Sequence, residues 1–132
     1  MSLVVDASVL VEILLQTPTG RAVQGRLRHT RPRAPDIIDA EVGAALRRAQ
    51  RKGVLTDRQL GHALDRLRDW PGRRIPTRLL IGGSRRWWGS ISAYDSLYLA
   101  VASAAGASVL TCDGRLSRAP GTGVPIENVR VI

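Results

Sequence analysis

The stretches Leu3-Val4-Val5-Asp6 and Ser108-Val109-Leu110-Thr111-Cys112-Asp113 decide the fold of this chain. Each is a short apolar run that ends at an aspartate, which is typical of a strand buried on both faces of a parallel sheet. The segments between them carry helical patterns separated by glycine and proline. Strands that alternate with helices predict an α/β fold, in which helices cover both faces of a mostly parallel sheet of four to five short strands.

The remaining elements follow from periodicity, caps and breakers. We expect helices over residues 7–15, 19 or 20 to about 29, 36–52, 57–70, 78–88 and 93–105. We expect short strands at 74–77 and 129–132, and a loop or a very short strand at 31–35. Asp36, Thr56 and Ser92 are the expected N-caps, and Gly53 and Gly106 the expected helix ends. No repeat or linker interrupts this pattern, so residues 1–132 form one domain.

The bulk composition restricts the class of protein. A chain of 132 residues with 44% hydrophobic residues is long enough to bury a core without disulfides. No apolar stretch is long enough to cross a membrane, and no signal-like run follows the first residues. The single cysteine, Cys112, cannot form an internal disulfide. These features predict a cytoplasmic protein with no membrane partner.

The charge indicates a polyanionic partner. The formal net charge is +9, and Lys52 is the only lysine among 20 basic residues. Arginine binds phosphate through a planar fork, so nucleic acid is a reasonable partner for so basic a domain. A genome whose base composition favours Arg codons would give the same bias without a functional cause, so the charge supports this inference without proving it.

Two of the 11 acids follow the two clearest strands. Asp6 ends the first and Asp113 ends the second. Because ligands bind at the carboxyl ends of the strands in open α/β sheets, both side chains are expected at one functional edge. Each could instead be an ordinary helix N-cap.

Two further acids lie on the apolar faces of expected helices. Glu41 is four residues from both Ile37 and Ala45, which places it on the buried side of helix 36–52. Asp95 is the only charged residue between Arg86 and Asp113, within the most apolar helix of the chain. A buried carboxylate costs roughly several kcal/mol unless a cation or hydrogen bonds offset the cost. A structural arginine could do so, but two such acids favour a shared cation.

The chemistry expected of four converging carboxylates is that of a hard divalent cation. Mg²⁺ or Mn²⁺ prefers oxygen ligands, whereas zinc would need His and Cys side chains that this chain does not group together. Such ions can activate a water and neutralise charge on a phosphodiester. No pair of histidines offers a metal-free alternative. The pattern therefore predicts a metal-dependent nuclease with Asp6, Glu41, Asp95 and Asp113 as catalytic metal ligands.

Four motifs carry a resemblance to a known family. They are D-A-S at 6–8, E-V-G-A-A-L-R-R at 41–48, Y-D-S-L-Y-L-A at 94–100 and T-C-D-G-R-L at 111–116. In this order and over nearly the whole chain, they resemble PIN domains, most closely the toxin subunits of bacterial VapBC toxin–antitoxin pairs. Some relatives have another acid just after the last aspartate, where residues 114–117 supply none.

The resemblance implies a PIN-like three-layer sandwich and an endoribonuclease that hydrolyses RNA with a metal-activated water. It places Asp6, Glu41, Asp95 and Asp113 on the family's four metal-site positions. Ser8 and Thr111 fall on hydroxyl positions that orient the carboxylates, although a helix cap and a plain strand threonine remain alternative readings. It also implies a small antitoxin that blocks the acidic cleft, and a toxin homodimer.

Candidate RNA contacts lie in the segment 82–89, which mixes cations with tryptophans. Arg85, Arg86 and, beside the last acid, Arg115 could contact phosphate, while an indole could stack on a base or simply pack in the core. Rival interpretations remain: a structure-specific DNA nuclease of the same fold, a non-catalytic nucleic-acid-binding module, and a receiver-like domain. The four acids disfavour the binding module, and the position of Lys52 disfavours the receiver.

Overall fold

The computed structural model describes residues 2–131 and is built on one five-stranded sheet. The strand order is β3-β2-β1-β4-β5, and every neighbouring pair is parallel. The strands are β1 (Leu3–Val5), β2 (Arg33–Pro35), β3 (Arg73–Ile75), β4 (Ser108–Thr111) and β5 (Ile126–Asn128). The two strands that the sequence marks most clearly, β1 and β4, lie side by side at the centre. The carboxyl ends of all strands therefore meet at one edge of the sheet.

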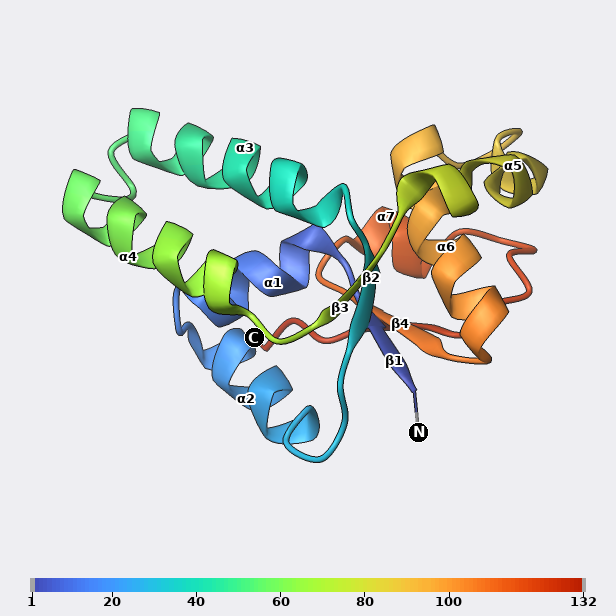
Figure 1. The fold of residues 1–132 in the computed structure, drawn as a ribbon, viewed down its shortest axis with the longest axis horizontal. Coiled ribbons are helices and arrows are strands. Elements are labelled where there is room, and N and C mark those ends of the chain that lie inside the picture. Colours follow the sequence, from blue (N-terminus) through green and yellow to red (C-terminus); the bar gives the residue numbers. More distant parts are fainter. Residues whose placement is uncertain (1, 132) are drawn as a thin grey trace.

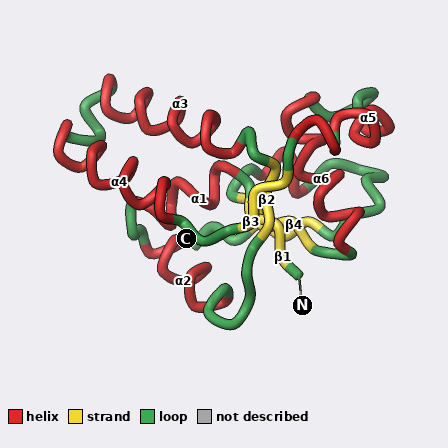
Figure 2. The backbone as a smooth tube through the Cα atoms, viewed as in Figure 1, coloured by secondary structure: helices red, strands yellow, loops and turns green. Residues whose placement is uncertain are grey.

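Helices cover both faces of this sheet (Figures 1 and 2). On one side lie α1 (Ala7–Leu14), α2 (Pro18–Arg26), α3 (Ile38–Arg51) and α4 (Asp57–Asp69). On the other side lie α5 (Ile81–Ser84) and α6 (Ala93–Ala105). Short elements complete the fold: η1 (Thr77–Leu79), η2 (Arg85–Trp87) and α7 (Gly114–Ser117). The expected three-layer α/β sandwich is confirmed.

The core lies where the central strands contact α1 and α6 and where α3 packs against α1. Its fully buried side chains are mostly aliphatic, and the largest are Tyr98, Leu10, Ile38, Leu46, Leu99 and Leu110. Two tryptophans, Trp70 and Trp87, are also buried, which confirms that at least one indole packs in the core. No helix within residues 2–131 is long and apolar enough to cross a membrane.

Side-chain caps set several helix ends where the sequence predicts them. Thr56 and Gln59 form a capping box at the start of α4. Ser92 caps α6, which ends at Gly106 with a left-handed φ of 61°. Because an L side chain is strained at this φ, glycine is the natural residue there.

Two expected helix starts are wrong. The helix α2 begins at Pro18, one or two residues before the expected start, because Thr17 accepts the backbone N–H of Gly20 and Pro18 occupies the first turn. Asp36 does not cap α3, which begins at Ile38 without a side-chain cap. Asp36 Oδ1 instead accepts hydrogen bonds from the Thr77 backbone N–H and hydroxyl at 3.0 and 2.5 Å. It thereby joins the carboxyl ends of β2 and β3.

Two expected elements also differ. The last strand is β5 at Ile126–Asn128, not 129–132, because β4 pairs with the earlier segment; Ile132 lies outside the described residues. The helix expected over 78–88 is broken into η1, α5 and η2. Gly82 and Gly83 weaken a continuous helix there.

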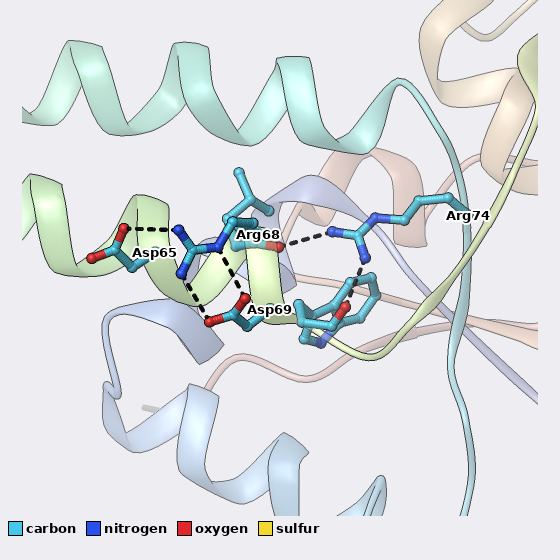
Figure 3. Close-up of polar contacts among 6 residues, drawn as sticks. Asp65, Arg68, Asp69 and Arg74 are labelled. Atoms are coloured by element: carbon cyan, nitrogen blue, oxygen red, sulfur yellow. Dashed lines mark hydrogen bonds and ion pairs between the residues drawn. The ribbon is translucent and has the colours of Figure 1, made fainter.

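Arg74 of β3 fastens the two long helices of the first layer to the sheet. Its guanidinium forms an ion pair with Asp39 of α3. It also donates to the carbonyls of Leu67 and Trp70 at the end of α4, and Figure 3 shows Arg74 reaching that end of the helix. It also lies 5.1 Å from the centroid of the Trp70 ring. The ion pairs of Arg68 with Asp65 and Asp69 in the same view are solvent-exposed, and such pairs contribute little to stability. Arg74, by contrast, holds α3 in place, and α3 carries Glu41.

Candidate active site

The four carboxylates singled out in the sequence line one cavity. Asp6, Glu41, Asp95 and Asp113 all border a hollow of about 500 Å³. They come from four separate elements: the end of β1, α3, the first turn of α6, and the turn after β4. The parallel sheet brings the two strand-end acids to one edge, and α3 and α6 reach that edge from opposite layers.

The strand-end acids also begin the helices that follow them. Asp6 is the N-cap of α1, and its Oδ1 accepts the Val9 backbone N–H at 3.1 Å. Asp113 is the N-cap of α7, and its Oδ1 accepts the Arg115 backbone N–H at 2.9 Å. The capping interpretation and the site interpretation are therefore compatible, because a capping bond holds each carboxylate in a defined orientation.

Two hydroxyls connect the Asp6 carboxylate to the backbone at the end of β4. Ser8 Oγ donates to Asp6 Oδ1 at 2.6 Å and accepts from the Cys112 backbone N–H at 2.9 Å. Thr111 is fully buried, its Oγ1 accepts the Asp113 backbone N–H at 2.9 Å, and its side chain also hydrogen-bonds Asp6. Ser8 and Thr111 thus lie between the ends of β1 and β4, where they fix the spacing of the two acids.

Glu41 is held by Tyr98, a residue that was not among those predicted from the sequence. The Tyr98 hydroxyl donates to Glu41 Oε1 at 2.6 Å, and Tyr98 is only 1% exposed. Tyr98 lies three residues after Asp95 on α6, so both face the cavity. That spacing in Y-D-S-L-Y was the available signal, but a tyrosine at such a position is more often simply part of the core.

Burial raises the pKa of three of the four carboxyls above its usual range. For Asp6, burial outweighs the hydrogen bonds from Ser8, Thr111 and the Val9 N–H, and the charge of Asp95 raises the pKa further. Burial likewise raises the pKa of Glu41 against the Tyr98 hydrogen bond, and the charges of Asp95 and Asp6 add to it. The pKa of Asp95 is raised by burial and then by the charge of Asp113. The site concentrates negative charge that favours either a proton or a cation.

These shifts predict that the metal-free protein becomes more stable on mild acidification. Each of the three carboxyls binds its proton more tightly when folded than in the unfolded chain, where the pKa values lie at about 3.9 for Asp and 4.3 for Glu. Folding therefore takes up protons above this range, and the free energy of unfolding rises as the pH falls through the folded pKa values. The urea midpoint in EDTA should be higher at about pH 5 than at about pH 7. A urea midpoint that falls on acidification would contradict the raised pKa values of Asp6, Glu41 and Asp95.

Positive charge also reaches the cavity, from residues other than those expected. Arg48 of α3 and Arg130 of the C-terminal segment line the carboxylate cavity. Arg115 lines an adjoining hollow that shares Asp95 and Asp113. Arg85 and Arg86 line neither hollow. The Arg86 guanidinium lies 3.9 Å from the Trp87 ring centroid and donates to Ser103 Oγ.

The donor set suits a hard cation in type and charge. Among residues 2–131, no three or more His, Cys, Asp or Glu side chains are grouped closely enough to hold a metal ion as they stand. Mg²⁺, however, usually keeps several waters and binds through only one or two carboxylates. The four carboxylates that meet in one cavity, with the pKa values of Asp6, Glu41 and Asp95 raised by burial, are the structural observation in favour of a cation. Hydrogen bonds and, for Asp95, the charge of Arg115 offset the effect of burial only in part.

Comparison with known proteins agrees with this architecture. The PIN domain family matches residues 3–121. Among curated relatives, "Ribonuclease VapC3" of Mycobacterium tuberculosis is 41% identical over 88% of this chain and 85% of its own. "Ribonuclease VapC12" of the same organism is 34% identical over 96% of this chain and 98% of its own. "Ribonuclease VapC1", also from that organism, is 37% identical over 96% and 97%.

A solved structure shares the fold. It is described as VapBC2 from Rickettsia felis bound to a DNA fragment from the promoter, and its TM-score against this chain is 0.67. The match covers 96% of this chain and 98% of the other, at 16% identity, so the likeness is evidence for the fold alone. From the family match and the three relatives, the chain belongs to the PIN-domain family and, within it, to the VapC type.

Proposed function

We propose that this protein is a Mg²⁺- or Mn²⁺-dependent endoribonuclease that acts as the toxin of a type II toxin–antitoxin pair. The observation that carries the proposal is the meeting of four carboxylates from four elements in one cavity of a chain with net charge +9. A binder of phosphates gains nothing from clustered negative charge, whereas a phosphodiester hydrolase needs it to hold cations. The names of the curated relatives support RNA as the substrate.

The residues divide the work in the following way. Asp6, Glu41, Asp95 and Asp113 would hold the divalent cation. When bound, the cation would polarise the scissile phosphate and promote the loss of a proton from the attacking water. Ser8 and Tyr98 keep Asp6 and Glu41 in fixed orientations, so little reorganisation is required when substrate binds. Arg48 and Arg130 supply positive charge at the same cavity, where they favour the phosphodiester over other solutes.

An antitoxin and a second toxin copy belong to this proposal. We infer that a small cognate antitoxin covers the carboxylate cavity in the resting complex, and that the toxin forms a homodimer. The description of the Rickettsia felis structure as VapBC2 supports a cognate antitoxin partner, and its position over the cavity is our proposal. A basic or hydrogen-bonding segment suits the cavity, because three of its carboxyls have raised pKa values and so favour positive charge.

The test is cleavage of an end-labelled RNA that contains an unpaired loop. With Mg²⁺ or Mn²⁺, the purified protein should cut the loop and leave 5′-phosphate and 3′-hydroxyl ends. EDTA should abolish cleavage, and added Mg²⁺ should restore it. Single-stranded DNA of the same sequence is the comparison substrate. Full cleavage in EDTA, or ends that carry a cyclic phosphate, would overturn the cation-dependent mechanism, and faster cleavage of the DNA would overturn the ribonuclease assignment.

A further inference from the structure

A further, smaller hollow adjoins the carboxylate cavity on the exposed side of α3. It measures about 270 Å³ and is bordered by Ala40, Glu41, Ala44 and Arg48 of α3 and by Tyr94 of α6. Glu41 and Arg48 also border the carboxylate cavity, so the two hollows adjoin. Ala40, Ala44 and Arg48 repeat every four residues and therefore form one stripe of the helix. The small alanines leave its floor open.

Tyr94 presents an aromatic ring beside this floor. It directly precedes Asp95 in the first turn of α6 and is 65% exposed. Burial in the core would be the usual use of a large aromatic side chain, as it is for Tyr98 on the same helix. A ring left in solvent one residue from a proposed metal ligand needs another explanation.

Arg48 completes the hollow with an uncommitted cation. Its guanidinium makes no hydrogen bond or ion pair within residues 2–131, and the side chain is exposed. Some arginines are engaged within the protein, as Arg74 is with Asp39 and Arg86 with Trp87. Arg48 differs from the other exposed arginines in that it borders both the carboxylate cavity and the smaller hollow. Arg48 is thus available to a ligand that enters between α3 and the start of α6.

We propose that Tyr94 and Arg48 form a subsite for one unpaired nucleotide next to the scissile phosphate. The base stacks on the Tyr94 ring, and the adjoining phosphate binds the planar fork of Arg48. The proposal rests on the proposed function, and it names the part of the RNA that the protein grips. Stacking needs an unpaired base, so the subsite selects single-stranded or looped RNA. Since every base has a stacking face, the subsite contributes affinity with little preference for sequence.

The test compares Tyr94→Ala and Tyr94→Phe on two RNAs, one intact and one with an abasic residue next to the cleaved bond. Tyr94→Ala should raise KM about tenfold with kcat changed less than about twofold, and Tyr94→Phe should resemble wild type. The abasic residue should weaken binding to the wild type about as much as Tyr94→Ala does. The abasic residue should reduce the RNA affinity of the Tyr94→Ala protein only slightly further, because the substitution and the abasic residue remove the same stacking contact.

The matched control for Arg48→Gln is Arg47→Gln. Arg47 is the neighbouring residue on α3, and its replacement removes the same charge, but its side chain borders neither hollow. Arg48→Gln should weaken RNA binding more than Arg47→Gln does. It should also reduce the slope of log affinity against log salt concentration by about one, as expected for the loss of one phosphate contact. Leu79→Ala, which removes another exposed apolar side chain at 64% exposure, should leave RNA binding unchanged.

Fluorescence anisotropy in EDTA measures binding without cleavage and so separates the subsite from the proposed nuclease activity. RNA that is bound through Tyr94 but never cut would support the subsite and overturn the nuclease. RNA that is cut with the same KM by wild type and Tyr94→Ala would overturn the subsite alone. If the abasic residue weakened RNA binding equally in wild type and Tyr94→Ala, the subsite would also be overturned. The exposed Tyr94 ring would then be assigned to contact with a protein partner.

Discussion

Replacement of Asp95 by Asn should lower the rate of RNA cleavage by at least about 100-fold while the protein stays folded. The change keeps the shape of the side chain and removes one of the charges that would hold the cation. Loss of cation stabilisation worth several kcal/mol at the transition state corresponds to this factor or more. The fold should tolerate it, because the pKa of Asp95 is raised by burial and the carboxylate is therefore a cost to the metal-free protein.

The stability of Asp95→Asn and the activity of a control variant separate a catalytic role of Asp95 from a structural one. In EDTA, Asp95→Asn should lower the free energy of urea unfolding by no more than about 1 kcal/mol. The change weakens the interactions of the carboxylate with the α6 N-terminus, Ser92 and Arg115, but it also removes a charge that burial and Asp113 disfavour. Asp65→Asn on α4 makes the same chemical change at an exposed carboxylate whose ion pair is with Arg68. It should leave cleavage unchanged. Equal activity of Asp95→Asn and wild type would return the four acids to a structural role.

Replacement of Gly20 by Ala should destabilise the protein by about 3 kcal/mol. Gly20 lies on α2 where that helix crosses α1, and a Cβ there would lie 2.0 Å from the Glu12 carbonyl oxygen. That oxygen cannot easily move aside, because it accepts the backbone N–H of Thr17. The two helices must therefore separate, which would also disturb the start of α1, where Asp6 is the N-cap.

Gly25 on the same helix is the matched control. A Cβ at Gly25 would meet nothing within 4 Å. Gly25→Ala should therefore stabilise the protein by about 0.5–1 kcal/mol through the higher helix propensity of alanine. Urea unfolding of both variants measures the contrast. A Gly20→Ala protein as stable as wild type would show that α1 and α2 are not packed as closely as described.

The parts of the fold that the sequence predicts are those set by local pattern. The apolar runs of β1 and β4 and the capped helix α6 carry their own signals and needed no tertiary information. The last strand did not: Val129-Arg130-Val131 has the stronger β pattern, yet the sheet uses Ile126–Asn128. The register of an edge strand is decided by its partner, since Val109, Leu110 and Thr111 of β4 pair with that earlier segment.

Some residues of the candidate site can likewise be recognised from local sequence, and others only from the tertiary structure. Asp6 and Asp113 are recognisable because they follow strands, and Glu41 and Asp95 because acids are rare on apolar helix faces. Tyr98, Arg48 and Arg130 carry no such local signal. Their place at the cavity depends on how α3, α6 and the C-terminal segment meet across the sheet. Arg85 and Arg86 illustrate the converse, since a basic and aromatic stretch of sequence lines neither carboxylate-bordered hollow.

The double use of Asp6 and Asp113 as helix caps has a genetic consequence. One base change converts an aspartate codon into an asparagine codon. Asparagine caps a helix about as well as aspartate does, so such a change removes charge from the cavity but keeps the Val9 and Arg115 backbone N–H groups capped. A lineage harmed by the proposed activity can therefore silence it in a single mutational step and still produce a folded protein. Reversal takes one further base change, so loss and recovery are equally accessible.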